Sequence, residues 1–250
     1  MFSISPSKID SYKQCPFKYK CDSDTAIRKK YKKDTPDLTF GNLIHACLND
    51  FYKRTKKEER TPERLRQLFE EKFKQDFSKH AKIFGSKENI INYVNKSKEC
   101  FKNFVKSEFF SGEPLMTEEY PKVLLGDDLE IGGKFDRVDI SDGNELTLID
   151  YKTGKFRDET ANEFQLDFYD LLLSKFQSRF KVKEKILFYL GENRIIRFNS
   201  NPQKYVLIED EIKKIANTIA SDKELKPRIN NLCRYCDYIS ICSAQNKQDL

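Results

Sequence analysis

The residues with the clearest potential for chemistry lie in GGKFDRVDISDGNELTLIDYKTGK, residues 132–155. Within this segment, LTLIDYK is a nearly continuous apolar run that predicts a buried central strand. Because side chains alternate between the two faces of a strand, Asp150 and Lys152 project together and Tyr151 points to the opposite face. An unpaired charge is costly to bury. The pair is therefore either a salt-bridged strand end or part of a reactive site.

A second carboxylate favours the reactive site. Asp136 lies fourteen residues before Asp150, on a predicted strand that a hairpin would bring alongside it. Two carboxylates held close together repel each other, and a divalent cation relieves this repulsion. Oxygen ligands of this kind suit Mg²⁺ or Mn²⁺. Because Lys152 would offset the negative charge that develops on a phosphate, the three residues predict metal-dependent hydrolysis of a phosphodiester.

This arrangement resembles the active site of the PD-(D/E)XK nuclease superfamily, in which an aspartate precedes an acidic-x-lysine motif on the next strand. Asp136 in GKFDRVD corresponds to the first acid, and Asp150 with Lys152 in IDYKTGK corresponds to the motif. The chain is most similar to the RecB-like and AddB-type nucleases, which add a histidine on an upstream helix. His45 in FGNLIHACLNDFY corresponds to this histidine. Outside such a motif, a single histidine is usually a helix-capping or core residue. The expected metal set is His45, Asp136, Asp150 and Tyr151.

The same families carry a Gln-x-x-x-Tyr motif on the helix that follows the lysine strand. Gln165 and Tyr169 in FQLDFYD fit this motif, and their spacing places them on one helical face. The resemblance implies that Gln165 orders the site and Tyr169 contacts nucleic acid, whereas the two residues alone would equally fit a surface glutamine and a core tyrosine. Glu119, on the strand before Asp136, is a further candidate for an outer metal ligand. The expected catalytic residues are Asp136, Asp150, Lys152, Gln165 and Tyr169.

A second constellation is made of cysteines near the end of the sequence. Cys233, Cys236 and Cys242 form a C-x2-C-x5-C pattern. Three thiols so close together indicate a metal site rather than a disulfide framework. Two other cysteines, Cys47 and Cys100, lie on apolar helical stripes and are predicted to be small buried hydrophobic residues.

The fourth ligand of this cysteine site is expected near the start of the sequence. Cys15 stands in YKQCP, and Cys21 is a rival without such a motif. The segment resembles the YxxCP-like motif of iron–sulfur RecB-like nucleases, among them AddB and the four-cysteine nucleases of CRISPR adaptation. This resemblance implies a [4Fe–4S] cluster that joins the two ends of the chain, whereas the ligand type alone would equally permit tetrahedral zinc. The expected cluster ligands are Cys15, Cys233, Cys236 and Cys242.

Length and composition limit the kinds of protein in which these sites can lie. The 250 residues suit one domain, or one domain with an insertion, and 46 basic against 40 acidic residues give a formal charge of +6. Only 38% of residues are hydrophobic and 34% are charged, but 20 Phe and 12 Tyr supply a core. We find neither a membrane-spanning apolar run nor a signal peptide. The odd number of cysteines, seven, favours a cytoplasmic location.

The elements that must position these residues follow from hydrophobic periodicity and turn signals. Ser5 and Pro6 predict the start of a short helix. Helices are expected at about 41–57, 62–80, 87–110, 158–180 and 204–221, and strands at 117–125, 129–140, 146–152, 182–190 and 194–198. The predicted fold class is α/β: a PD-(D/E)XK core with a central mixed sheet flanked by helices, an N-terminal helical insertion and a terminal Fe–S staple. We expect one nuclease domain over residues 1–250, in which 1–30 and 225–245 form the staple, 40–112 the helical region and 113–222 the catalytic core.

Taken together, the resemblance implies a Mg²⁺- or Mn²⁺-dependent deoxyribonuclease, an exonuclease that acts on single-stranded DNA or DNA ends. Endonucleolytic trimming and an RNA substrate stay open. The chain lacks a Walker motif and is not itself a helicase, so its expected partners are a helicase or a CRISPR adaptation complex, in DNA repair or defence. The rival is a non-catalytic, metal-stapled nucleic-acid-binding subunit. Basic runs at 28–33 and 53–57, with Tyr31 and Phe156, could contact phosphates and bases.

Overall fold

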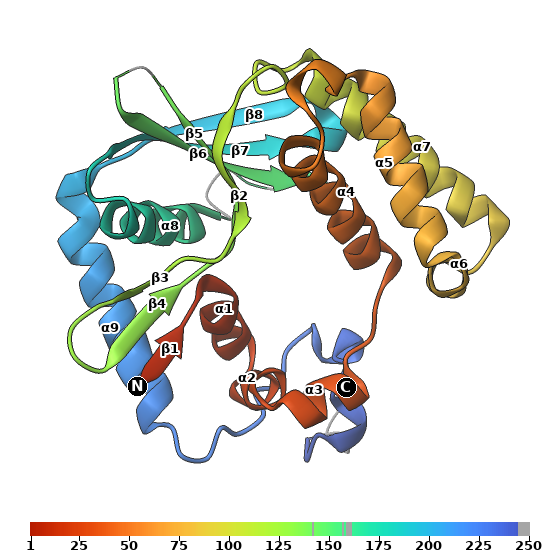
Figure 1. Ribbon diagram of the computed structural model, residues 1–250. Coiled ribbons are helices and arrows are strands. Elements are labelled where there is room, and N and C mark those ends of the chain that lie inside the picture. The colour runs from red at the N-terminus through yellow and green to blue at the C-terminus, as the bar shows by residue number, and fades with distance from the viewer. Residues whose placement is uncertain (142, 157, 159–161, 245–250) are drawn as a thin grey trace. The chain divides into compact units, whose positions relative to one another are not determined.

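The computed structural model describes residues 1–141, 143–156, 158 and 162–244 (Figure 1). It divides into two compact units. Unit 1 comprises Met1–Lys33, Lys122–Gly133 and Gln203–Leu250, and unit 2 comprises Asp34–Pro121 and Lys134–Pro202. Among the described residues, every helix is too short or too polar to cross a membrane.

Unit 2 is built on a five-stranded sheet in the order β2-β5-β6-β7-β8. Strands β6 and β7 are parallel, and helix α8 lies between them in the sequence, as a parallel connection requires. All the other neighbours in this sheet are antiparallel. The mixed sheet flanked by helices confirms the predicted fold class. The strands are β2 (Pro114–Glu119), β5 (Phe135–Ile140), β6 (Glu145–Lys152), β7 (Lys181–Tyr189) and β8 (Arg194–Asn199).

One face of this sheet is covered by helices from the N-terminal part of unit 2, which can be followed in Figure 1. Their apolar side chains form the main hydrophobic core with Ile149 and Tyr151 of β6 and Ile186 and Phe188 of β7. Helix α4, which carries His45, begins where the Thr35 side chain accepts a hydrogen bond from the main chain. The helices are α4 (Pro36–Lys53), α5 (Pro62–Gln75), α6 (Phe77–Phe84) and α7 (Lys87–Lys106).

Helix α8 (Glu163–Phe176) packs against the opposite face, where a buried lysine fixes it to β7. Lys185 is 4% exposed, and its Nζ lies 2.5 Å from Asp167 Oδ1 and 3.4 Å from Asp170 Oδ2. Ser200 donates a further hydrogen bond to Asp170. Because removing one member would leave a buried charge unpaired, this cluster resists any rotation of α8 on the sheet.

Unit 1 contains a three-stranded sheet in the order β1-β4-β3 and joins the two ends of the chain. The side chain of Ser5 caps α1 and Pro6 is its first residue, as predicted. Asn230 donates a hydrogen bond to the carbonyl of Gln14, and Tyr238 donates one to Asp22. The elements are β1 (Phe2–Ile4), α1 (Pro6–Gln14), α2 (Pro16–Ser23), α3 (Thr25–Tyr31), β3 (Lys122–Leu124), β4 (Leu129–Gly132) and α9 (Tyr205–Ser221).

The two strands predicted at 117–125 and 129–140 are each divided in the structure. Pro121, which has no amide hydrogen for a ladder, separates β2 from β3, and Gly133 separates β4 from β5. The hairpin predicted at the Gly-Asp-Asp turn is present, but it pairs with β1 in unit 1. The helix predicted at 62–80 is likewise two helices. The start predicted for the helix at 158–180 includes residues outside the described part of the chain.

Candidate active site

Three potential metal ligands from three elements of unit 2 meet near one end of its sheet. They are His45 of α4, Glu118 of β2 and Asp136 of β5, and one ligand atom of each lies within 4.8 Å of the others. His45 Nδ1 lies 3.1 Å from Asp136 Oδ1 and 3.3 Å from Glu118 Oε1. All three side chains are largely buried. Carboxylate oxygens suit Mg²⁺ or Mn²⁺, and imidazole nitrogen is a ligand for first-row transition metals rather than for Mg²⁺.

The charge on His45 follows from its two acidic neighbours. Burial alone would lower the pKa of His45, but the charges and hydrogen bonds of Asp136 and Glu118 outweigh it and raise the pKa to about 10. Burial alone would raise the pKa of Glu118, but hydrogen bonds from His45 and Lys134 lower it. Without a cation the site is therefore held by an imidazolium between carboxylates. A cation that binds His45 must displace this proton.

Asp150 and Lys152 of β6 project to the same face, as predicted, and form an ion pair. Asp150 Oδ2 lies 2.6 Å from Lys152 Nζ and, apart from this ion pair, has no hydrogen-bond partner among the described residues. Burial raises the pKa of the Asp150 carboxyl; Lys152 lowers it, and the charge of Asp136 raises it further. A buried acceptor of this kind is short of partners and is available to a cation.

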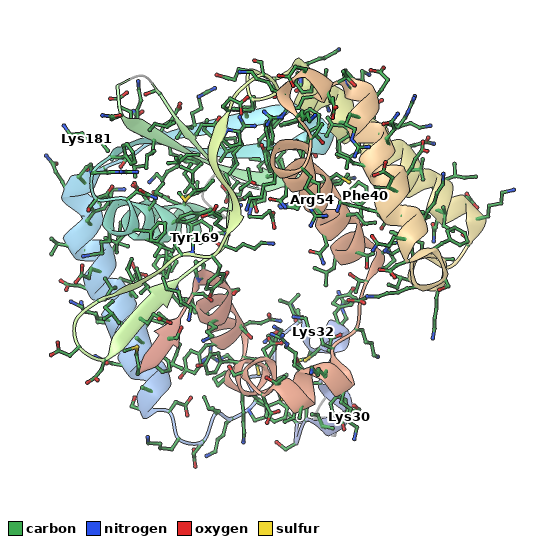
Figure 2. All side chains as sticks on the ribbon, viewed as in Figure 1. Lys30, Lys32, Phe40, Arg54, Tyr169 and Lys181 are labelled. Carbon is green, nitrogen blue, oxygen red and sulfur yellow. The ribbon has the colours of Figure 1, made fainter. Side chains whose placement is uncertain are left out.

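The Gln165 side chain connects this ion pair to α8. Its Oε1 accepts a hydrogen bond from Lys152 Nζ at 3.3 Å, and its Nε2 donates to Asp150 Oδ1 at 3.5 Å and to the Tyr169 hydroxyl at 3.4 Å. Tyr169, labelled in Figure 2, is buried with its ring edge-on to Phe135. The structure thus brings together four of the five residues predicted to be catalytic, and the fifth, Asp136, lies beside them.

Asp136 is tied to β6 through the main chain of Tyr151. The Tyr151 amide donates a 2.8 Å hydrogen bond to Asp136 Oδ2, while the other oxygen faces His45. The Tyr151 ring packs on the α4 side of the sheet, with its centroid 6.2 Å from that of His45. A role for Tyr151 as a metal ligand stays a prediction.

The glutamate beside His45 is Glu118 and not Glu119, the residue singled out from the sequence. Glu119 is half exposed and lies 3.8 Å from Lys53 Nζ. Glu118 has a positive φ of 53°, a conformation that residues other than glycine adopt rarely and that often marks a functional site. The sequence alone gives no signal that distinguishes Glu118 from Glu119.

Sequence reasoning also missed Arg137, which follows Asp136 and is completely buried. Its guanidinium donates to the Tyr52 hydroxyl at 2.7 Å, to the carbonyl of Phe109 at 2.8 Å and to Asp139. A Cβ on Gly112 would lie 2.6 Å from Nη2 of this guanidinium, so a larger residue there would have to displace it. Because Tyr52 belongs to α4, Arg137 links the helix of His45 to the strand of Asp136.

The four cysteines predicted to hold a cluster line one pocket of unit 1: Cys15, Cys233, Cys236 and Cys242. The main-chain amide of Arg228 donates to the sulfur of Cys15 at 3.3 Å, and that of Asn230 donates to Cys233 at 3.4 Å. Cys21 is buried and is not among the lining residues. Cys47 and Cys100 are buried in the core of unit 2, as predicted.

The basic run at 53–57 is largely neutralised by acids. Lys53 pairs with Glu119, and Arg54 pairs with Asp50. Lys57 also lies near an acid, 3.4 Å from Glu113. The run at 28–33 extends from the last turn of α3, where Lys30 lies over the Tyr31 ring; Lys30 and Lys32 are labelled in Figure 2.

A sequence profile of the PD-(D/E)XK nuclease superfamily matches residues 3–243 of the chain. The chain belongs to this superfamily. It is 25% identical over 252 residues to a subunit of an ATP-dependent helicase/deoxyribonuclease of Clostridium kluyveri, in a match that covers 85% of this chain. It is 30% identical over 181 residues, 61% of the chain, to the subunit of the same name from a Thermoanaerobacter species. The chain spans only 21% and 15% of the lengths of these relatives.

The fold of this PD-(D/E)XK protein also matches that of a solved structure, a candidate exonuclease from Eubacterium rectale. The TM-score is 0.54 at 12% sequence identity, with 95% of this chain and 87% of the other covered. At this identity the similarity concerns the fold alone. The predicted superfamily is confirmed, and the iron–sulfur branch stays a prediction.

The two adjacent glutamates provide a matched test of the metal site. We expect Glu118→Gln to weaken Mn²⁺ binding roughly tenfold or more, because it removes a charged oxygen beside His45 and Asp136. Glu119→Gln removes the same charge from a half-exposed position and should change the affinity less than about twofold. Titration calorimetry with Mn²⁺ measures both. Equal effects of the two substitutions would contradict this assignment.

Proposed function

We propose that the chain is a metal-dependent nuclease that hydrolyses phosphodiester bonds in DNA. One observation carries this proposal: the His45–Glu118–Asp136 cluster and the Asp150–Lys152 ion pair adjoin each other, linked through the Tyr151 amide. A structural salt bridge does not require two further acids and a histidine beside it. A metal site with an adjacent ammonium group is what phosphodiester hydrolysis needs.

Each side chain has a role that its contacts support. His45, Glu118, Asp136 and Asp150 would hold the cation, which when bound supplies Lewis-acid activation of the phosphate and of water. Lys152 would place its charge beside the scissile phosphate, and Gln165 orients the Lys152 ammonium through its 3.3 Å hydrogen bond. Burial lowers the pKa of Lys152 but Asp150 outweighs this, so the net pKa is raised and the ammonium keeps its proton at neutral pH.

The names of the relatives support the proposed substrate and partner. Both relatives named above are helicase/deoxyribonuclease subunits, so DNA is the proposed substrate and a helicase the proposed partner. The names of these relatives support a helicase more than a CRISPR adaptation complex. Action on DNA ends or single strands is the expected mode. The seven cysteines, none of them in a disulfide among the described residues, agree with the proposed cytoplasmic location.

Cleavage of labelled DNA tests the proposal. Wild-type protein with Mn²⁺ should degrade linear single-stranded DNA, stop on addition of EDTA, and spare circular single strands if it is an exonuclease. Blocking one end of the DNA at a time gives the polarity of cleavage. RNA of the same sequence tests whether the substrate must contain deoxyribose. Asp150→Asn and Lys152→Met should each lower the rate by about 100-fold or more.

Lys102→Met is the control, because Lys102 is an exposed lysine on α7 whose partner is Glu99. It should cleave at the wild-type rate. If folded wild-type protein with bound Mn²⁺ binds DNA without cleaving it, the nuclease proposal is wrong and the rival, a non-catalytic binding subunit, is favoured.

We further propose that the pocket of unit 1 holds a [4Fe–4S] cluster. The four thiols, Cys15, Cys233, Cys236 and Cys242, line one pocket, and two of their sulfurs accept main-chain hydrogen bonds. Four thiolates alone would equally suit a tetrahedral zinc ion. The choice of a [4Fe–4S] cluster is supported by the resemblance of the Cys15 segment, YKQCP, to the motif of iron–sulfur RecB-like nucleases.

Metal analysis after anaerobic purification tests this second proposal. We expect about four iron atoms and four sulfides per chain. Cys15→Ser and Cys233→Ser should lose iron and lower the unfolding temperature, because the cluster joins the two ends of the chain. Cys21→Ala, which changes a buried thiol outside the lining, should keep its iron. Zinc in place of iron, or iron loss in Cys21→Ala alone, would contradict the assignment.

A further inference from the structure

A row of side chains crosses the sheet of unit 2 away from the candidate active site. Lys152 of β6 is opposite Tyr189 of β7, and Tyr189 is opposite Arg194 of β8. Residues opposite each other on neighbouring strands project to the same face. Tyr189 shares its face with Lys185, which contacts α8, so the whole row lies on the face of the Asp150–Lys152 pair. Adjacent strands are about 4.8 Å apart, which puts the Arg194 backbone roughly 10 Å from that of Lys152.

Arg194 is held at the end of this row by an aromatic ring from the segment after the lysine strand. Its guanidinium carbon lies 3.9 Å from the centroid of Phe156. The Phe156 ring meets Tyr189 edge-on at 5.4 Å, and the Phe156 amide donates to Glu192 Oε1 at 3.3 Å. The arginine is therefore stacked on a ring that is itself fixed from two sides.

Ion pairs distinguish this guanidinium from that of Arg197 on the same strand. Arg194 is exposed and has no ion-pair partner among the residues that the structure describes. Arg197 on the same strand differs, because it points to the other face and pairs with Glu108 and Glu184. An exposed arginine that is oriented by stacking but not neutralised has a planar cationic surface free for a ligand.

We propose that Arg194, supported by Phe156, is a stacking subsite for the base of a nucleotide next to the scissile phosphate. The proposal rests on the nuclease activity proposed above. Guanidinium planes and aromatic rings stack on unpaired bases without regard to sequence, whereas a base inside a duplex does not expose its face. The carboxylate of Glu192 near Phe156 makes a phosphate less favourable than a base at this place. The subsite thus selects single-stranded nucleic acid.

Oligonucleotides with one abasic position test this subsite on the full chain with Mn²⁺. Moving the abasic position along a linear single strand should lower kcat/KM of the wild type about tenfold at one position beside the cut, and little elsewhere. Arg194→Gln and Phe156→Leu should lower kcat/KM on the intact strand by a similar factor and lose the sensitivity to that abasic position. Lys181→Gln makes the same charge change as Arg194→Gln and should behave as wild type. Lys181, labelled in Figure 2, is the first residue of β7, and Tyr189 is the last.

Two results separate this proposal from the others. If Arg194→Gln lowers activity equally on intact and abasic strands, the stack only holds its segment in place and the subsite is refuted. If the wild type cleaves no nucleic acid, the nuclease proposal fails. Fluorescence anisotropy in Ca²⁺ then tests the subsite by measuring the affinity for single-stranded DNA. If Arg194→Gln binds as tightly as wild type, the subsite is refuted. If it binds intact DNA roughly tenfold more weakly but abasic DNA equally well, the subsite is supported.

Discussion

Repulsion among carboxylates gathered at one end of a sheet is the constraint on which the site depends. Glu118 and Asp136 both face His45, and the charge of Asp136 also acts on buried Asp150. Without a cation, the His45 imidazolium and the Lys152 ammonium supply the compensating charges. A divalent cation would replace the proton on His45 and leave Lys152 beside it. Exchanging the His45 proton for a divalent cation would add one positive charge, which offsets more of the repulsion among the carboxylates.

The scaffold keeps these charges close against their repulsion. Arg137 connects the helix of His45 to the strand of Asp136 through Tyr52, and the Tyr151 amide connects Asp136 to β6. Lys185, clamped by two aspartates, fixes α8 and with it the amide of Gln165. Each link is a buried polar contact that is costly to break. The positions of the reactive groups are thus determined by unit 2 itself.

Local periodicity was enough to predict part of this site. The alternation in LTLIDYK placed Asp150 and Lys152 on one face, and the four-residue spacing of Gln165 and Tyr169 placed both on one side of α8. The pairing of His45 with Asp136 came from resemblance to a family, because no local pattern joins residues 91 positions apart. Glu118 was missed because the choice between it and Glu119 depends on the register of β2 on β5, which places Glu118 between the pairs Thr117–Arg137 and Glu119–Phe135, next to Asp136. The division of the predicted hairpin between two sheets depends on pairing with β1, far away in the sequence.

The most direct measurement of the central claim is an anomalous difference map from crystals soaked in Mn²⁺ and, separately, in Mn²⁺ at a pH low enough to protonate the carboxylates. We expect one strong peak about 2.1 Å from ligand atoms of His45, Glu118 and Asp136, with Asp150 turned toward it, and loss of the peak at low pH. A manganese peak at another place in a fully soaked crystal would contradict this claim. So would a peak that these side chains do not contact.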